Sequence, residues 1–318
     1  MMRNIILKFI LLLFLFPVIA QAAKVMDVDT EFDFRSAWYQ TKKSEEENLK
    51  FLIKALTTTE KGKEIVSKAS KKAGMYGLTL MDVIGVGEGS LTDTTLIRKF
   101  SANDPTQVLY ETRSKVFVNR RLKLLDAVLD FAHELTHFTY RDPFNPYVSH
   151  FHLDDFIKST VEGTGGEVEA FVAECHVLKQ LRPGETFRHS NCQRILDEKT
   201  GEISREVGVR EFYKVGKHFP DLKKDLEKFA LKHEQLPQTS GEEAPFISSA
   251  YGLPYPVAAI KEYTNIMDRV CRNDQNRINL LQEKLQRSPA SIGPVVTAQS
   301  FENIFEDFRT RCERFVTK

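Results

Sequence analysis

After its first 22 residues the sequence has no apolar stretch long enough to cross a membrane. A transmembrane helix needs about 20 consecutive apolar residues, so we expect no membrane span in the mature chain. The chain begins with the basic Arg3, continues with an apolar run of about a dozen residues, and carries the small residues Ala20 and Ala22. This pattern predicts a cleavable secretory signal peptide over residues 1–22 and therefore a secreted or periplasmic protein.

The sequence also lacks an excess of either charge, with 45 Lys and Arg residues against 44 Asp and Glu residues. Loss of Arg3 and Lys8 with the signal peptide leaves 43 basic against 44 acidic residues. Nucleic-acid binders and proteins that bind membrane surfaces usually carry a clear basic excess. We therefore do not expect nucleic acid as a partner. Asn-x-Ser/Thr glycosylation sites are missing as well, which fits a bacterial export route.

Cysteine is scarce, and no pair of cysteines has the CxxC spacing of a thiolate metal site. The four cysteines all follow the predicted signal peptide, and an even number in an exported chain favours disulfides over free thiols. Three pairings can be drawn. We prefer Cys175 with Cys192 and Cys271 with Cys312, because each pair closes a short loop.

Helical spacing of apolar residues covers most of the chain. Two β-type runs, QVLYET (107–112) and SKVFVN (114–119), predict a hairpin that turns at Arg113 and Ser114. The sequence therefore predicts an α+β fold, mostly helical, with a small β-sheet before the helix at 122–138. Helices are expected at 42–74 (two, with a break at Gly62), 122–138, 154–161, 167–181, 223–233, 257–286 and 301–316. Loops are expected at 75–94 and 235–256, where Gly, Pro, Ser and Thr are frequent.

We expect three regions after the signal peptide. They are an N-terminal helical region (23–105), a catalytic region (106–234) and a C-terminal helical region (235–318) that forms one compact unit with the catalytic region. No internal repeat is present.

The segment HELTH, residues 133–137, lies inside the helix predicted at 122–138. Residues four apart on an α-helix differ by about 40° around the axis, so His133 and His137 project to the same side and can share one metal ion. Glu134 is one step further round the helix. Its carboxylate can reach a water molecule on the metal without filling the coordination shell. The pattern predicts a zinc site with Glu134 as the general base.

Catalytic zinc usually takes three protein ligands and keeps one position open. The third ligand must come from outside HELTH, and Tyr140 stands where the metzincin pattern requires glycine. The downstream helix, in GGEVEAFVAEC, offers Glu167, Glu169 and Glu174. Glu167 and Glu169 are displaced by about 200° on a helix, so only one of them can be the ligand. Glu174 lies on the same face as Glu167, either to orient a histidine or as an ordinary surface acid.

HELTH followed by a helix that carries EVEA resembles the gluzincin branch of zinc peptidases. In gluzincins of this kind the third-ligand segment reads ExxA followed by Asp, and its first Glu binds zinc. The resemblance implies Glu167 as the ligand, with Glu169 as the alternative, and aligns Ala170 with the small residue. Phe171 departs from the pattern, since the family places Asp there. The resemblance covers about 60 residues and implies a zincin-like fold, in which an edge strand before the metal helix aligns an extended peptide. SKVFVN is the expected edge strand.

The sequence thus predicts an exported zinc metallopeptidase that hydrolyses peptide bonds of a peptide or protein substrate through a zinc-activated water, with Glu134 as general base. The alternative is a catalytically silent exported zinc-binding or envelope-interaction protein. Spacing does not single out the donor that stabilises the oxyanion. By type, the candidates are His150, His152, Tyr140, Tyr147, Tyr251 and Tyr255.

Overall fold

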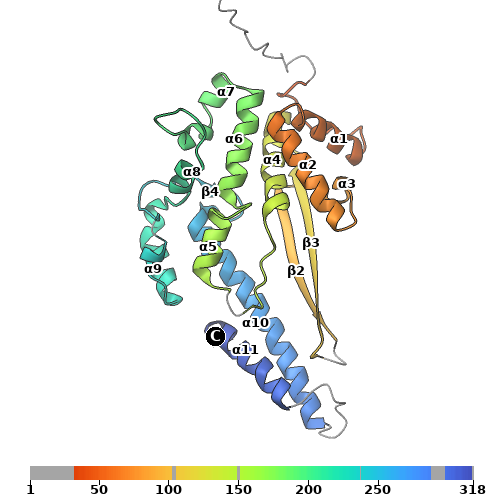
Figure 1. The fold of residues 1–318 in the computed structure, drawn as a ribbon, viewed down its shortest axis with the longest axis vertical. Helices are drawn as coiled ribbons and strands as arrows, with labels where there is room; N and C mark the ends of the chain where they lie inside the picture. The colour runs from red at the N-terminus through yellow and green to blue at the C-terminus, as the bar shows by residue number, and fades with distance from the viewer. Residues whose placement is uncertain (1–31, 102–104, 149–150, 237, 288–297, 317–318) are drawn as a thin grey trace, which may run out of the picture.

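The computed structural model describes residues 32–316 apart from 102–104, 149–150, 237 and 288–297. The predicted signal peptide, residues 1–22, lies outside the described residues. The fold is α+β, with a small sheet and many helices, as the sequence predicts (Figure 1).

A three-stranded sheet contains β1 (Ile84–Gly87), β2 (Leu91–Phe100) and β3 (Val108–Asn119), in the order β1-β3-β2. β3 pairs parallel with β1 and antiparallel with β2. The predicted hairpin with a turn at Arg113 and Ser114 is wrong, because both β-type runs form the single strand β3. The true hairpin joins β3 to β2, whose first part, residues 91–94, lies in a segment that we expected to be a loop.

SKVFVN therefore belongs to the central strand, and β1 and β2 are the edge strands of this sheet. The prediction of SKVFVN as the edge strand is wrong, because β3 pairs with β1 on one side and with β2 on the other. The β2–β3 hairpin spans residue 105, so the expected N-terminal and catalytic regions share one sheet.

The two N-terminal helices are α1 (Glu45–Leu56) and α2 (Glu60–Met75). The break lies at 57–59 and not at Gly62, which is inside α2. The Thr59 side chain caps α2 by accepting a hydrogen bond from the Gly62 N–H. A Cβ atom at position 62 would lie 2.0 Å from the carbonyl oxygen of Leu56, so the glycine allows the close turn between the helices.

Two long helices form the centre of the molecule, α4 (Leu124–Tyr140) and α6 (Glu167–Leu181). They pack against each other and match the predicted helices at 122–138 and 167–181 (Figure 1). The predicted helix at 223–233 occurs as α9, which starts earlier, at Phe219, and ends before Ala230, whose φ is 57°. The other α-helices of the described residues are α3 (Leu80–Val83), α5 (Leu153–Val161), α7 (Glu185–Arg188), α8 (Arg205–Phe212), α10 (Tyr255–Arg287) and α11 (Ala298–Val316). The strands β4 (Ile247–Ser248) and β5 (Leu253–Pro254) form a short ladder.

The buried apolar residues form two clusters, and α6 contributes to both. One cluster joins α1, α2, β3 and α4, and includes Val177 of α6. The other joins α5, α8, α9, α10 and α11, and includes Val168 of α6. The helix pair α4 and α6 is thus held from both sides by packed side chains, which fixes the relative position of any residues that they share.

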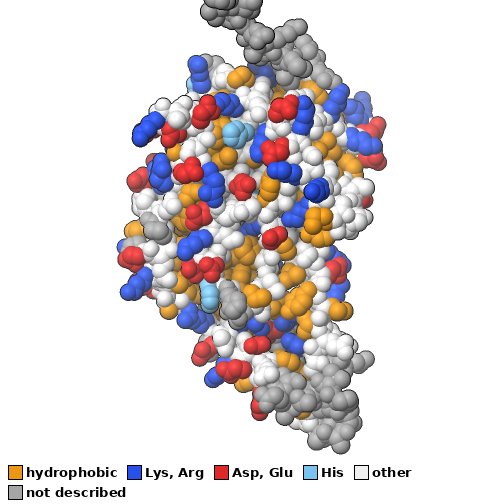
Figure 2. All heavy atoms as spheres, viewed as in Figure 1, with side chains coloured by type: hydrophobic (Ala, Val, Ile, Leu, Met, Phe, Trp, Pro, Cys, Tyr) orange, Lys and Arg blue, Asp and Glu red, His pale blue; other side chains and the backbone are white. Residues whose placement is uncertain are grey.

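Both preferred disulfides are present, Cys175–Cys192 and Cys271–Cys312. The first ties α6 to the 3₁₀ turn Asn191–Ile195, and the second ties α10 to α11. In the described part of the chain, no helix is both long and apolar enough to cross a membrane. Basic and acidic side chains are interspersed over the face shown in Figure 2.

Candidate metal centre

His133 and His137 lie one turn apart on α4, as their spacing requires. Their ring centroids are 4.8 Å apart and their planes are inclined by 78°. The apolar positions of α4, among them Leu124, Val128 and Leu135, are buried. Packing of these side chains directs the neighbouring face, with both histidines, toward α6.

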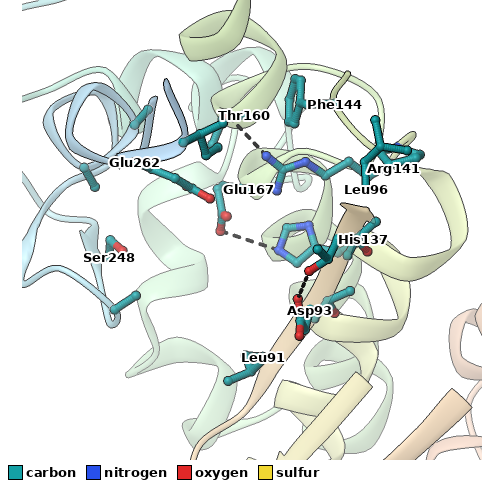
Figure 3. A pocket seen from close by; sticks show the side chains of 18 of the residues that line it. Leu91, Asp93, Leu96, His137, Arg141, Phe144, Thr160, Glu167, Ser248 and Glu262 are labelled. Atoms are coloured by element: carbon teal, nitrogen blue, oxygen red, sulfur yellow. Dashed lines mark hydrogen bonds and ion pairs between the residues drawn. The ribbon is translucent and has the colours of Figure 1, made fainter. Parts of the chain in front are cut away.

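Glu167, the first residue of α6, brings a carboxylate between the two imidazoles. Its Oε2 atom is 3.5 Å from Nε2 of His133. The same atom is 3.6 Å from Nε2 of His137 (Figure 3). One ligand atom from each of the three residues lies within 4.8 Å of the others. Two imidazole nitrogens and one carboxylate oxygen suit a first-row divalent metal such as zinc and leave a coordination position open. The residues present therefore fit a metal ion.

The second nitrogen of each imidazole has a partner outside this cluster. Nδ1 of His137 is 2.7 Å from the carbonyl oxygen of Gly165, and Nδ1 of His133 is 3.3 Å from Oε2 of Glu174. A carbonyl oxygen can only accept, so Nδ1 of His137 carries a proton, and in the neutral imidazole Nε2 is the nitrogen with the lone pair that a metal ion would use. Such contacts orient metal-binding histidines and raise their basicity.

Glu174 thus takes the orienting position that the sequence left open. Phe171, where the family would place Asp, instead packs against Phe212 and Phe246, with ring centroids 5.7 and 4.8 Å away. The carboxylate next to a histidine comes from Glu174, about one turn later on the same helix.

Glu169 is not part of the cluster. Its Oε2 atom accepts a hydrogen bond of 2.7 Å from the Gly165 N–H. The carboxylate therefore stabilises the turn that presents the Gly165 carbonyl to His137. Gly165 has a φ of 67°, and a Cβ atom there would lie 2.4 Å from the backbone nitrogen of Arg141, so only glycine fits this turn.

The charges around the cluster stabilise positive charge at its centre. Burial alone would lower the pKa of His133, but hydrogen bonds with Glu167 and Glu174 and the charge of Glu134 raise it well above its usual value. Burial would raise the pKa of Glu167, yet the two histidines hold it well below the usual range. A divalent cation supplies positive charge at this same point.

Glu134 lies beside the cluster without belonging to it. Its Oε2 atom accepts a hydrogen bond of 2.7 Å from the Thr92 hydroxyl, which is also 2.8 Å from the Glu134 carbonyl oxygen. One turn earlier on α4 is Asp130, whose pKa burial raises to about 6, while a hydrogen bond with Ser90 opposes the shift.

The centre opens into a cleft of about 1040 Å³ between β2 and α10. Every residue from Gly89 to Arg98 lines this cleft. Side chains alternate between the two faces of a strand, so an unbroken run of lining residues means that the free backbone edge of β2 borders the cleft. Glu262 of α10 and Arg141, the residue after α4, also line the cleft and approach Glu167 (Figure 3). The guanidinium of Arg141 donates a hydrogen bond to the Thr160 hydroxyl.

Among the described oxyanion candidates, Tyr255, the first residue of α10, is the one that interacts with a residue of the cluster, Glu167. Burial raises the pKa of its phenol most, and the charge of Glu167 and a hydrogen bond with Glu167 raise it further, so the phenol stays protonated. Tyr147 and Tyr251 also line the cleft. Tyr140 contacts Glu64 instead, His152 is exposed at the start of α5, and His150 lies outside the described residues.

Two residues at the centre, Thr92 and Gly165, were not singled out from the sequence. Thr92 lies in a polar stretch that reads as a loop, although LTDTTLIRKF has the residue types of a half-buried strand. Gly165 lies in EGTGGE, whose glycines indicate a turn between two helices but no contact with a histidine.

Comparisons with known proteins add no further assignment. A scan of family models matched none to this chain, and searches of the curated proteins and of the solved structures found no significant match.

Proposed function

We propose that the protein is a gluzincin-like zinc metallopeptidase that hydrolyses peptide bonds. The observation that carries the proposal is the convergence of His133, His137 and Glu167, from two helices, with Glu134 beside them at a cleft. A three-ligand centre that opens into a cleft is typical of catalytic zinc, whereas structural zinc is usually closed by four protein ligands.

A zinc ion bound there would supply polarisation of the scissile carbonyl and a lowered pKa of a water molecule. The chain supplies the proton transfers. Glu134, held by Thr92 and outside the ligand set, accepts the proton of the attacking water and passes it to the leaving amine. Tyr255 keeps its phenolic proton and offers a donor to the negative charge that develops on the oxygen of the scissile carbonyl.

The proposed substrate is an extended peptide segment. The free edge of β2 carries unpaired N–H and C=O groups along the cleft, and such an edge binds a peptide backbone as an additional strand. This role replaces the one that we expected for SKVFVN. The two disulfides suit an oxidising compartment, which supports the proposed export.

The test combines metal content with hydrolysis. We expect the purified protein to bind one zinc ion and to cleave unfolded polypeptide, with activity lost to a chelator and restored by zinc. Zinc binding without cleavage of any member of a peptide library would overturn the peptidase proposal. That result would favour the alternative, a catalytically silent zinc-binding protein.

A second comparison tests the ligand set. Glu167→Ala is expected to lower zinc content, whereas Glu169→Ala is expected to retain zinc, because its carboxylate contacts only the turn at Gly165. Loss of zinc in Glu169→Ala alone would contradict the assignment of Glu167.

A further inference from the structure

The hydroxyl of Thr92 contacts Glu134 twice, although the two residues are 42 positions apart in the chain. Its Oγ1 atom is 2.7 Å from Oε2 of the carboxylate and 2.8 Å from the carbonyl oxygen of the same residue. Both distances are typical of O–H···O hydrogen bonds. A hydroxyl has one hydrogen, and both acceptors here belong to Glu134. Whichever of the two oxygens accepts this hydrogen, the Thr92 side chain remains in contact with Glu134.

The position of Thr92 is fixed by the sheet and not by a flexible loop. Thr92 pairs with Val116 of β3, which is fully buried in the core that includes α4. Residues directly opposite each other in an antiparallel pair point to the same face, so Thr92 faces α4 as Val116 does. The strand register therefore sets the distance between the hydroxyl and Glu134.

A glutamate side chain has several rotatable bonds, and ordering it costs conformational entropy. The contact with Oε2 restricts these rotations and leaves the second carboxylate oxygen, Oε1, without that hydrogen bond. Because Glu134 lines the cleft beside His133, a carboxylate held in this way is ordered before substrate arrives.

We propose that Thr92 is a positioning residue for the reaction, which holds the Glu134 carboxylate in its proton-accepting orientation. This inference rests on the proposed peptidase function. Thr92 also lies in the strand whose free edge would pair with the substrate backbone. β2 would therefore position both the substrate and the base, because a shift of this strand relative to α4 would move the bound peptide and the Thr92 hydroxyl together.

The test is Thr92→Val, which removes the hydroxyl and preserves the branched shape of the side chain. Misplacement of a catalytic group by about 1 Å can lower a rate by about a hundredfold. We expect kcat to fall about ten- to hundredfold, with KM, zinc content and melting temperature unchanged. Thr92→Ser, which restores the hydroxyl, should recover most of the lost kcat.

Thr139→Val is the matched control. Thr139 is on α4, and its buried hydroxyl has no hydrogen-bond partner among the described residues. The same chemical change there should leave kcat and KM as in the native protein.

The outcomes separate this inference from the proposed function. If the zinc-loaded native protein cleaves peptides and Thr92→Val cleaves them equally fast, the positioning role is overturned while the peptidase proposal stands. A rise in KM at constant kcat, a loss of zinc, or failure of Thr92→Ser to recover activity also overturns it. If the native protein does not hydrolyse peptides at all, both proposals fall.

Discussion

The contact between Glu174 and His133 leads to a quantitative prediction about metal affinity. Oε2 of Glu174 is 3.3 Å from Nδ1 of His133, on the side of the ring opposite to the cluster. Replacement of such an orienting carboxylate typically weakens metal binding by about 10- to 100-fold. We expect Glu174→Gln to raise the zinc dissociation constant by this factor, which corresponds to about 1.4–2.7 kcal/mol.

The assay is competition with a chromophoric chelator at fixed pH, for the native protein and two variants. Glu169→Gln is the matched control, since it makes the same chemical change on the same helix and keeps an oxygen that can accept from the Gly165 N–H. We expect its zinc affinity to equal that of the native protein. Equal affinity in Glu174→Gln and the native protein would refute the orienting role of Glu174.

Three further predictions concern stability. Asp274 is buried and forms ion pairs with Arg98 and with Arg311, the latter at 2.6 Å. Asp274→Asn should therefore lower the free energy of unfolding, measured by urea denaturation, by about 3–5 kcal/mol. A decrease below about 1 kcal/mol would contradict a buried ion network. Replacing both Cys271 and Cys312 by Ser opens a loop with a sequence separation of 41 and should cost about 4 kcal/mol by chain entropy; unchanged stability in the same assay would oppose this. The pKa of Asp130 is raised to about 6, so its burial lowers stability as the pH rises from about 4 through 6. Metal-free Asp130→Asn should therefore be more stable than native metal-free protein at pH 7.5, by up to about 3 kcal/mol, with no difference near pH 3. A pH-independent difference would contradict the titration of Asp130.

The helical part of the site could be predicted because its spacing is local. His133 and His137 share one side of α4 by the geometry of any helix, and the choice between Glu167 and Glu169 followed only from a family resemblance. The separation of 200° could show that the two acids have different roles, but not which one faces α4. That choice depends on how α6 packs between the two apolar clusters.

The strand part of the site could not be predicted. β2 is half buried and rich in Thr, so it lacks the apolar alternation that identifies a strand. The segment SKVFVN has that alternation because β3 is central and packs against α4, and it was mistaken for the edge. The contact of Thr92 with Glu134 joins residues far apart in the chain, so it cannot be inferred from residue spacing.

The central claim is tested most directly by Glu134→Gln. We expect this variant to bind one zinc ion, as the native protein does, because Glu134 is outside the ligand cluster. Its hydrolysis of an unfolded polypeptide, measured at equal zinc content, should fall by at least about a hundredfold. Hydrolysis at the native rate by zinc-loaded Glu134→Gln would contradict the account.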